Sequence, residues 1–336
     1  MANDYAMATK ARALYSKHLS PQNYAAMLDL DTVGEVASYL KGQTRYLSVL
    51  EGVNEEAIHR EFLEQRIRSI AMSEFSLLMR YVQKDKHHFY QFYLKELEMN
   101  HLIFVLRAIE SGSTHHYGQF LNELNHLMVF DVDALMVCTT YQDVLKVVAD
   151  TEYRKVLGVL SSDDVDLSQV EDLLQAHYNQ TMLTLIKSEE SDDELLNIFI
   201  MQLELENIAL IYRMKKYFDV SPQDMHARRM GPTLHISEKK IKEWVETADS
   251  DTILSDLESS YYGQFGPFDD VNHIEHYFDT IRYKTLKRLM RFSTNTDVTL
   301  FAYMSLVTLE IKNVIDVVEG VRYKIAPQEI EKLLIY

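Results

Sequence analysis

Three pairs of residues in this sequence have the spacing of metal ligands on a helix. Each pair reads Glu-x-x-His, and the pairs are Glu56/His59, Glu98/His101 and Glu123/His126. Residues three apart share one face of a helix, so a glutamate and a histidine at this spacing can bind one metal ion together. Helical bundles that hold two iron or manganese ions use such pairs on facing helices. The pattern therefore raises the hypothesis of a helical metal enzyme.

The second pair lies in a segment that the chain repeats. The three copies, which start 106 residues apart in both steps, are EMNHLIFVLR (98–107), ELENIALIYR (204–213) and EIKNVIDVVE (310–319). His101 is replaced by Asn207 and Asn313 in the other copies, while Glu56 and Glu123 lie in other parts of the repeat. The repeat therefore does not keep a metal-binding histidine, and we expect no metal site and no cofactor.

A second motif follows nearly the same period. It reads Thr-x-Tyr or Ser-x-Tyr, with copies at Thr44-Arg45-Tyr46, Thr151-Glu152-Tyr153 and Ser259-Ser260-Tyr261, and the copies start 107 and 108 residues apart. Two three-copy motifs that keep the same phase indicate three homologous modules of domain length. We expect these modules at residues 1–115, 116–222 and 223–336.

Helical periodicity positions these motifs. Apolar residues at three- to five-residue steps predict a pair of long antiparallel helices in each module, preceded by shorter helices. The predicted pairs fall within 54–111, 168–217 and 270–323, with polar turns at 84–88, 188–194 and 293–297. Ser20 and Ser221, each followed by proline, are typical of helix N-caps. The sequence therefore predicts an all-α fold.

The repeated segment places its polar residues on two faces of its helix. Three pairs lie in apolar stripes and are expected to form interhelical hydrogen bonds in a core seam; they are Glu98/His101, Glu204/Asn207 and Glu310/Asn313. The last position of the segment is Arg107, Arg213 or Glu319, and it points away from this seam. We expect these three residues, with Arg322 beside Glu319, to face a partner.

Glu319 differs in charge from its equivalents Arg107 and Arg213. An unpaired charge is costly to bury, so the reversal needs a specific reason. One hypothesis is that Glu319 and Arg322 contact a partner protein. The alternative is an ion pair between Glu319 and a neighbouring helix.

Composition excludes several classes of function. The chain has 336 residues, a formal net charge of −17, 10 glycines, 5 prolines and one cysteine, Cys138. Nucleic acid and anionic lipid are improbable partners for so acidic a chain. A single cysteine permits no internal disulfide and favours a reducing compartment. No continuous apolar run approaches the length of a membrane span, and there is no signal-peptide core.

The usual catalytic motifs are missing from the sequence. It contains no GxxxxGK[ST], GxGxxG, GxSxG or HExxH pattern. We expect His87, His88, His115 and His116 to be solvated and Cys138 to be in the core. We therefore expect no catalytic residues in this chain.

The two ends of the chain resemble a known family. Residues 11–50 contain Leu-Ser-x-x-Asn-Tyr, Thr-x-x-Glu-Val-x-x-x-Leu and Thr-x-Tyr at Leu19, Ser20, Asn23, Tyr24, Thr32, Glu35, Val36, Leu40, Thr44 and Tyr46. Residues 301–325 contain a closing Glu-x-x-Asn-Val helix. These patterns resemble the C subunit of the V-type and A-type rotary ATPases, which is called the d subunit in eukaryotic enzymes. His101, where the other copies have asparagine, departs from the pattern.

The resemblance implies a non-catalytic rotor subunit. The family fold is a funnel of three similar helical subdomains around a pseudo-threefold axis. Its broad side contacts the membrane proteolipid ring, and its socket holds the central shaft, so torque passes through it. The resemblance also implies that the chain lies at the cytoplasmic face of a membrane. Protein partners would hold it there, without insertion into the bilayer. The alternatives are a helical scaffold or adaptor of another assembly and the helical metal enzyme.

Overall fold

The structure is a computed structural model, and its elements are all helices. It describes residues 2–55, 58–81, 90–112, 124–162, 165–188, 193–218, 220–229, 231–268 and 274–336. No strand occurs in these residues, so the all-α prediction is confirmed. The chain forms two compact units. The first contains residues Met1–Gln83 and Ser250–Tyr336, and the second contains Lys84–Asp249. The division into three modules concerns sequence repeats and stays a prediction.

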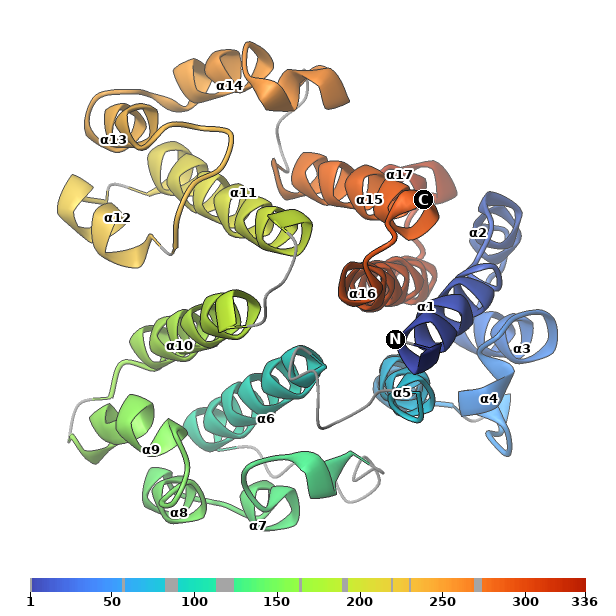
Figure 1. Ribbon diagram of the computed structural model, residues 1–336. Coiled ribbons are helices and arrows are strands. Elements are labelled where there is room, and N and C mark those ends of the chain that lie inside the picture. Colours follow the sequence, from blue (N-terminus) through green and yellow to red (C-terminus); the bar gives the residue numbers. More distant parts are fainter. Residues whose placement is uncertain are drawn as a thin grey trace. The chain divides into compact units, whose positions relative to one another are not determined.

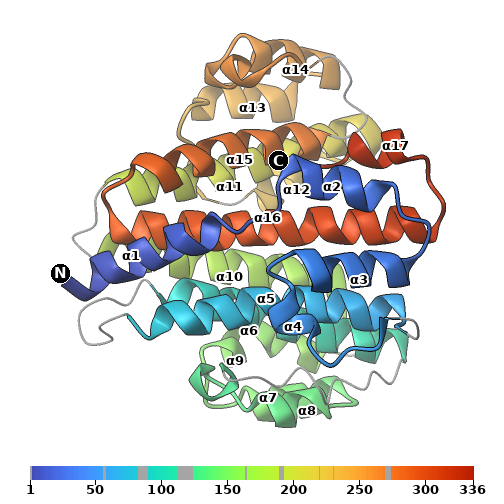
Figure 2. The ribbon, with the colours of Figure 1, turned by 90° about the vertical axis from the view of Figure 1, so that its right-hand side faces the viewer.

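The first unit is built around one long helix, α16 (Thr296–Arg322). The helices α1 (Ala2–Tyr15), α5 (Arg60–Met79) and α15 (Ile274–Phe292) pack against it, as Figure 2 shows. Most of the side chains of α16 are buried, since neighbours cover it on several sides. The shorter elements of the first unit are α2 (Pro21–Leu28), α3 (Val33–Gln43), α4 (Leu47–Leu50), α14 (Ser250–Glu258), η4 (Tyr261–Phe265) and α17 (Pro327–Glu331).

The described residues of the second unit form three long helices. They are α6 (Gln91–Ser111), α10 (Leu167–Ser188) and α11 (Asp193–Tyr217), and α10 packs against both of the others (Figure 1). Its shorter elements are η2 (Asn125–Leu127), α7 (Val132–Met136), α8 (Tyr141–Val147), α9 (Tyr153–Val156), η3 (Leu157–Ser161), α12 (Pro222–Arg228) and α13 (Glu238–Glu246). Apolar side chains of α6, α10 and the helices between them form one core cluster.

Capping interactions explain two of the motifs at the start of the chain. The side chain of Ser20 caps α2, and Asn23 reaches back to the backbone N–H of Ser20 (2.8 Å). Thr32 caps α3 in the same way, and Glu35 accepts from the backbone N–H of Thr32 (3.0 Å). Each is a capping box, which satisfies N–H groups at a helix start. The patterns Leu-Ser-x-x-Asn and Thr-x-x-Glu are therefore helix-start signals.

The long helices lie close to their predicted ranges. α10, α11, α15 and α16 begin or end within a few residues of the bounds expected from periodicity. Ser221 is the N-cap of α12, as predicted. The predicted turn at 84–88 and most of the turn at 188–194 lie outside the described residues. In the third pair, residues 293–295 connect α15 to α16, and these two helices pack together.

The third copy of the Thr-x-Tyr motif is one residue later than we predicted. Tyr262 is fully buried, whereas Tyr261 is exposed. The backbone N–H of Tyr262 donates to Oγ of Ser260 (3.1 Å), just as that of Tyr46 donates to Oγ1 of Thr44 (3.2 Å). The copy is therefore Ser260-Tyr261-Tyr262. The sequence has two serines followed by two tyrosines, so the motif could start at Ser259 or at Ser260. The burial of Tyr262 distinguishes the two registers.

Two helices among the described residues are long and apolar enough to cross a membrane. They are α11 and α16, and 67% and 72% of their most apolar windows are buried within the structure. We expected no such segment, because no continuous apolar run in the sequence approaches the length of a membrane span. Buried core helices meet the same criterion of length and composition, so this finding is weak evidence for a membrane span.

Candidate functional site

The glutamates that open the three repeated segments are buried. Glu98, Glu204 and Glu310 expose only 1%, 0% and 5% of their surface. A buried carboxylate needs several hydrogen-bond donors to offset its lost hydration. The surroundings of each glutamate therefore show what the repeated segment does.

Glu310 on α16 is the centre of a buried ionic network in the first unit. Its Oε2 accepts from the backbone N–H of Leu19 (2.7 Å). Its Oε1 accepts from Nη2 of Arg45 (2.6 Å) and from the hydroxyl of Tyr46 (3.1 Å). Arg45 also forms an ion pair with Glu74 of α5. The network thus connects α16, α5 and the segments that flank α2 and α4.

His18 borders this network and stays neutral. Its Nδ1 lies 3.2 Å from Oε2 of Glu310. Burial, and then the nearby Arg45 cation, lower the pKa of His18 well below its ordinary value. The neutral imidazole therefore lies against the Glu310 carboxylate without adding a charge to the network.

Glu98 on α6 has the same kinds of partners in the second unit. Its Oε1 accepts from the backbone N–H of Val129 (3.0 Å), and its Oε2 accepts from the hydroxyl of Tyr153 (3.0 Å). Lys95 donates to the same Oε2 (3.0 Å) and also pairs with Glu152 (2.8 Å). Tyr153 and Tyr46 occupy the same place in the repeated Thr-x-Tyr motif, so both copies use the tyrosine hydroxyl alike.

Glu204 on α11 receives backbone donors. Its Oε1 accepts from the backbone N–H groups of Leu234 (2.9 Å) and Ile236 (2.8 Å). The N–H of His235 donates to both carboxylate oxygens, at 3.1 Å each. Three successive N–H groups turned toward one carboxylate form an anion-binding loop, and here the anion is the chain's own side chain.

The three glutamates share one role in the fold. Each accepts from a backbone N–H one or two residues before the N-cap of a short helix; these caps are Ser20 of α2, Asp131 of α7 and Ser237 of α13. The repeated glutamate therefore holds the start of a small helical layer on a long helix. Sequence reasoning missed these partners, although an apolar residue before Ser20, Asp131 and Ser237 was a usable signal.

The second polar residue of the core seam, which is His101, Asn207 or Asn313, has different surroundings in the three copies. The side-chain amide of Asn313 donates to the backbone carbonyl of Ile335 (2.7 Å) and accepts from its N–H (3.0 Å). Asn207 is buried on α11. His101 contacts its own helix, with Nδ1 2.6 Å from the carbonyl of Leu97. Burial lowers the pKa of His101.

The donor set around Glu98 does not suit a metal ion. Both oxygens of its carboxylate are engaged by N–H, ammonium and hydroxyl donors. Among the described residues, no group of three His, Cys, Asp or Glu side chains could hold a metal. Glu56 and Glu123 of the metal hypothesis lie outside the described residues, as do the four histidines that we expected to be solvated, His87, His88, His115 and His116. Cys138 is half-buried against the core cluster of the second unit.

The outer position of the repeated segment carries ion pairs in two copies. Arg107 on α6 binds Glu171 of α10 through two hydrogen bonds (2.6 and 2.7 Å). Glu319 on α16 pairs with Arg60 of α5. The charges are exchanged between the two pairs, so the reversal at Glu319 is matched by a cation on the neighbouring helix. This is the ion pair that we gave as the alternative, and a partner contact of Glu319 remains a prediction.

The other two outer residues lie at helix ends. Arg213 is exposed on α11 and borders a hollow of about 830 Å³ at the end of that helix. Arg322 is exposed at the end of α16, and its guanidinium lies over the ring of Tyr323 (5.2 Å).

One carboxyl group of the second unit titrates near neutral pH. Burial, and then the Glu206 carboxylate of α11, raise the pKa of Glu96 on α6 to about 7. The unfolded chain ionises such a group near pH 4.3. The folded protein therefore binds more protons between about pH 4.3 and 7, and it loses stability as pH rises through this window.

A Glu96→Gln variant should remove this loss, because glutamine does not ionise. We expect the variant to be more stable than the wild type at pH 8 by roughly 1–3 kcal/mol, with the difference closing toward pH 5. Urea unfolding at both pH values, followed by the fluorescence of the single tryptophan, Trp244, measures it. Glu206→Gln is the matched control and should give a smaller gain. Equal stability of Glu96→Gln and wild type at both pH values would contradict the prediction.

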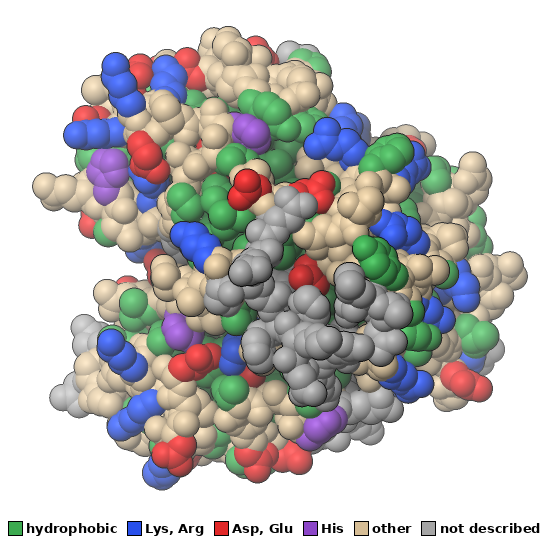
Figure 3. Space-filling view, in the orientation of Figure 1, with side chains coloured by type: hydrophobic (Ala, Val, Ile, Leu, Met, Phe, Trp, Pro, Cys, Tyr) green, Lys and Arg blue, Asp and Glu red, His purple; other side chains and the backbone are tan. Residues whose placement is uncertain are grey.

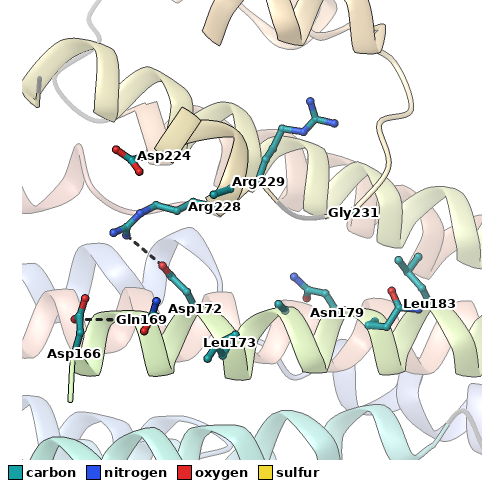
Figure 4. Close-up of a pocket in the computed structure, with 13 residues that line it drawn as sticks. Asp166, Gln169, Asp172, Leu173, Asn179, Leu183, Asp224, Arg228, Arg229 and Gly231 are labelled. Atoms are coloured by element: carbon teal, nitrogen blue, oxygen red, sulfur yellow. Dashed lines mark hydrogen bonds and ion pairs between the residues drawn. The ribbon is translucent and has the colours of Figure 1, made fainter. Parts of the chain in front are cut away.

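A hollow of about 490 Å³ lies between α10 and α12 (Figure 4). Asp172 of α10 and Arg228 of α12 form an ion pair across it (3.2 Å). Arg229 pairs with Glu238. Asp166 accepts from backbone N–H groups at the start of α10. The Asp172–Arg228 pair joins the two helices, and we assign no reaction to the hollow.

Charged side chains of both signs are spread over the face of the molecule in Figure 3. On the described part of that face, Lys and Arg stand singly or in small groups among Asp and Glu. The buried glutamates and the surface charges of both signs together describe an all-helical protein. Its repeated carboxylates hold the helical layers in place.

Comparison with known proteins identifies the family. The family model for the ATP synthase (C/AC39) subunit matches residues 7–333 of this chain. The chain therefore belongs to the ATP synthase (C/AC39) subunit family, and the resemblance found in the sequence is confirmed. It is also similar to the C subunit of the A-type ATP synthase of Methanosphaera stadtmanae. The two are 21% identical over 280 residues, which cover 81% of this chain and 68% of the relative.

Proposed function

We propose that this chain is the non-catalytic central-rotor subunit of a V-type or A-type rotary ATPase. It links the central shaft to the membrane proteolipid ring and transmits torque between them. The observation that carries the proposal is the family match, which spans residues 7–333. The proposed arrangement is a funnel of three helical subdomains around a pseudo-threefold axis, at the cytoplasmic face of the membrane and held there by protein partners.

The buried carboxylates support this proposal on physical grounds. A part that transmits torque must resist deformation, and each long helix that bears a repeated glutamate is connected to a neighbouring layer by several hydrogen bonds. Breaking such a buried, charge-assisted connection is costly, so the layers move together. A shaft and a ring of different symmetry also require unlike contacts, which three non-identical modules can supply.

Co-purification tests the proposed function. A tagged copy of the chain, expressed in its native cell, should bring down the shaft subunits and the proteolipid of a rotary ATPase in fixed ratio. Purification with a different, reproducible set of proteins would favour the scaffold or adaptor alternative and contradict the rotor function.

Glu319 tests whether the outer position serves a partner as well as the fold. Arg60 and Glu319 keep 32% and 29% of their side-chain surface exposed, so their ion pair contributes less than about 1 kcal/mol. We propose that Glu319, with Arg322, also contacts the shaft or the proteolipid loops. Glu319→Gln should then leave the melting temperature nearly unchanged and lower the ion transport obtained per ATP hydrolysed.

The chain offers a matched control for this variant. The double exchange Arg60→Glu with Glu319→Arg places an arginine on α16, as Arg107 is placed on α6. Arg60 also pairs with Glu64 of α5 (3.1 Å), so the exchange costs a little stability on that side. If Glu319 serves only the ion pair, the exchanged protein should nevertheless couple as wild type. Full coupling in the exchanged protein would therefore refute the partner contact, whereas reduced coupling at near-normal stability supports it.

A further inference from the structure

Two of the three repeated helices end in equivalent surface features. Lys216 and Tyr217 close α11, and Arg322 and Tyr323 lie 106 residues later at the end of α16. The first repeat has glutamate and serine at the corresponding positions 110 and 111. We call residues 213–218 and 220 the α11 tip and residues 320–325 the α16 tip. Each belongs to a different compact unit and is described by itself.

Each tip exposes an aromatic ring with a cation placed over it. Tyr217 and Tyr323 expose 54% and 61% of their surface. The Lys216 ammonium lies 5.5 Å from the centre of the Tyr217 ring, and the Arg322 guanidinium lies 5.2 Å from that of Tyr323. The Lys216 ammonium also donates to the hydroxyl of Tyr212 (2.8 Å). This bond fixes the cation at the tip, which lowers the entropy cost of binding a partner through it.

Apolar side chains accompany both cations. Phe218 is 64% exposed beside Tyr217, and Ile325 is 45% exposed beside Tyr323. The hollow of about 830 Å³ that borders the α11 tip is lined by Leu210, Met214, Phe218 and Val220 among others. Tyrosine and arginine are enriched in protein-binding hot spots, and a cation over an aromatic ring is attracted to it whether it belongs to arginine or lysine.

The charge of the tips opposes that of the chain. Residues 213–220 contain three cations and one acid, and residues 320–325 contain two cations and no acid, whereas the whole chain has a net charge of −17. Cations at a helix C-terminus also stabilise the helix dipole, so the charge alone does not define a binding surface. The exposed ring and apolar side chain beside each cation have no such role in the helix.

From this combination we propose that the α11 and α16 tips are docking points for an acidic polypeptide segment of a partner subunit. An Asp or Glu side chain of that segment pairs with Lys216 or Arg322. Its neighbouring apolar residues cover the exposed ring and, at the α11 tip, enter the hollow. The inference rests on the proposed function, because it takes the partner to be another subunit of the same rotary complex.

A lipid surface fits these tips less well. Binding to anionic lipid gains from many cations on one face, and each tip offers only two or three within an acidic chain. A hollow lined largely by apolar side chains beside a fixed cation suits a side chain of defined length. The partner is therefore a protein surface, and lipid binding is an outcome that the experiment must be able to reveal.

Carbodiimide coupling in the purified rotary complex tests the proposal. The reagent joins a lysine amine to a carboxylate in contact with it through an amide bond, so native Lys216 and Lys324 report on acidic neighbours. Mass spectrometry should find one or both of them joined to Asp or Glu of another subunit. Cross-links from both lysines only to this chain's own acids would overturn the proposal.

Binding by matched variants completes the test. Lys216→Gln with Tyr217→Ser, combined with Arg322→Gln and Tyr323→Ser, should melt as wild type within a few degrees yet lose about tenfold or more in retention by the complex in a salt wash. Lys146→Gln removes an exposed lysine elsewhere, on α8, and should be retained as wild type. Wild-type retention of the tip variant would refute the docking points.

Two further results are separable. Flotation with phosphatidylglycerol vesicles that depends on the same four residues would overturn the proposal in favour of a lipid surface. If the tagged wild-type chain does not purify with a rotary ATPase at all, the proposed function itself fails. If it does purify with the complex, but the tips neither cross-link to another subunit nor affect retention, only the docking inference fails.

Discussion

A Glu310→Gln variant should lose about 3–5 kcal/mol of folding free energy, among the largest effects expected for a substitution that preserves side-chain shape. The carboxylate accepts from Leu19, Arg45 and Tyr46 in a buried site. Glutamine would remove one of the two carboxylates that balance Arg45, leaving only Glu74, and would place an amide group, itself a donor, among three donors. Urea unfolding followed by circular dichroism measures the loss.

The matched control is Glu246→Gln, which alters an exposed glutamate whose oxygen lies 3.7 Å from the Lys242 ammonium. An exposed ion pair of this kind contributes less than about 1 kcal/mol, so this variant should unfold almost as wild type. Glu98→Gln should behave like Glu310→Gln, because Glu98 likewise faces a cation, a hydroxyl and a backbone N–H. A loss below about 1 kcal/mol for Glu310→Gln would show that the network is not the connection we describe.

An Asn313→Ala variant should release the C-terminal segment. The amide of Asn313 binds both backbone groups of Ile335, and Tyr336 stacks on Tyr24 with ring centres 4.8 Å apart. Without the amide, two buried backbone groups lose their partners, at a cost of about 2–5 kcal/mol unless the segment detaches into water. Carboxypeptidase should therefore remove residues from the variant many times faster than from the wild type.

Thr308→Ala is the control on the same helix, because this exposed threonine donates only to the carbonyl of Met304 within α16. It should resist carboxypeptidase as the wild type does. A second variant tests the same segment from the other side. A Cβ added to Gly320 would lie 2.4 Å from Cδ1 of Ile330 in α17, so Gly320→Ala should also increase digestion. Unchanged digestion of both variants would contradict the account of this segment.

Local signals made much of the fold predictable from sequence. The apolar periodicity of α10, α11, α15 and α16 extends over five or more helical turns, and periodicity of that length is typical of a packed helix. Ser20 and Ser221 were recognisable as caps because a cap depends only on its immediate neighbours. The 106-residue period gave the repeated organisation without any knowledge of tertiary contacts.

The partners of the buried polar groups could not be predicted in this way. Glu204 was paired in sequence reasoning with Asn207, its neighbour on the helix, but its carboxylate accepts from backbone N–H groups about thirty residues later. The partner of Glu310 lies near the other end of the chain, at Leu19. Helical spacing determines which residues share a face, whereas the packing of distant segments determines what meets that face.

The last position of the repeated segment shows the same limit of prediction from sequence. The reversal from arginine to glutamate at residue 319 was visible in the sequence, and its matching cation, Arg60, was not, because no local rule connects α16 with α5. The register of the third Ser-x-Tyr copy could not be predicted either, because Tyr261 and Tyr262 fit the sequence pattern equally well. In the structure only Tyr262 lies in the core.

We propose that this chain couples ATP hydrolysis to ion transport without catalysing either. The most direct measurement compares ATP hydrolysis with ATP-driven ion uptake in membrane vesicles from cells that lack the chain, before and after the purified protein is added back. The account predicts hydrolysis without ion uptake in its absence, and uptake restored by the added wild-type protein. Full ATP-driven uptake in vesicles that lack the chain would contradict the account.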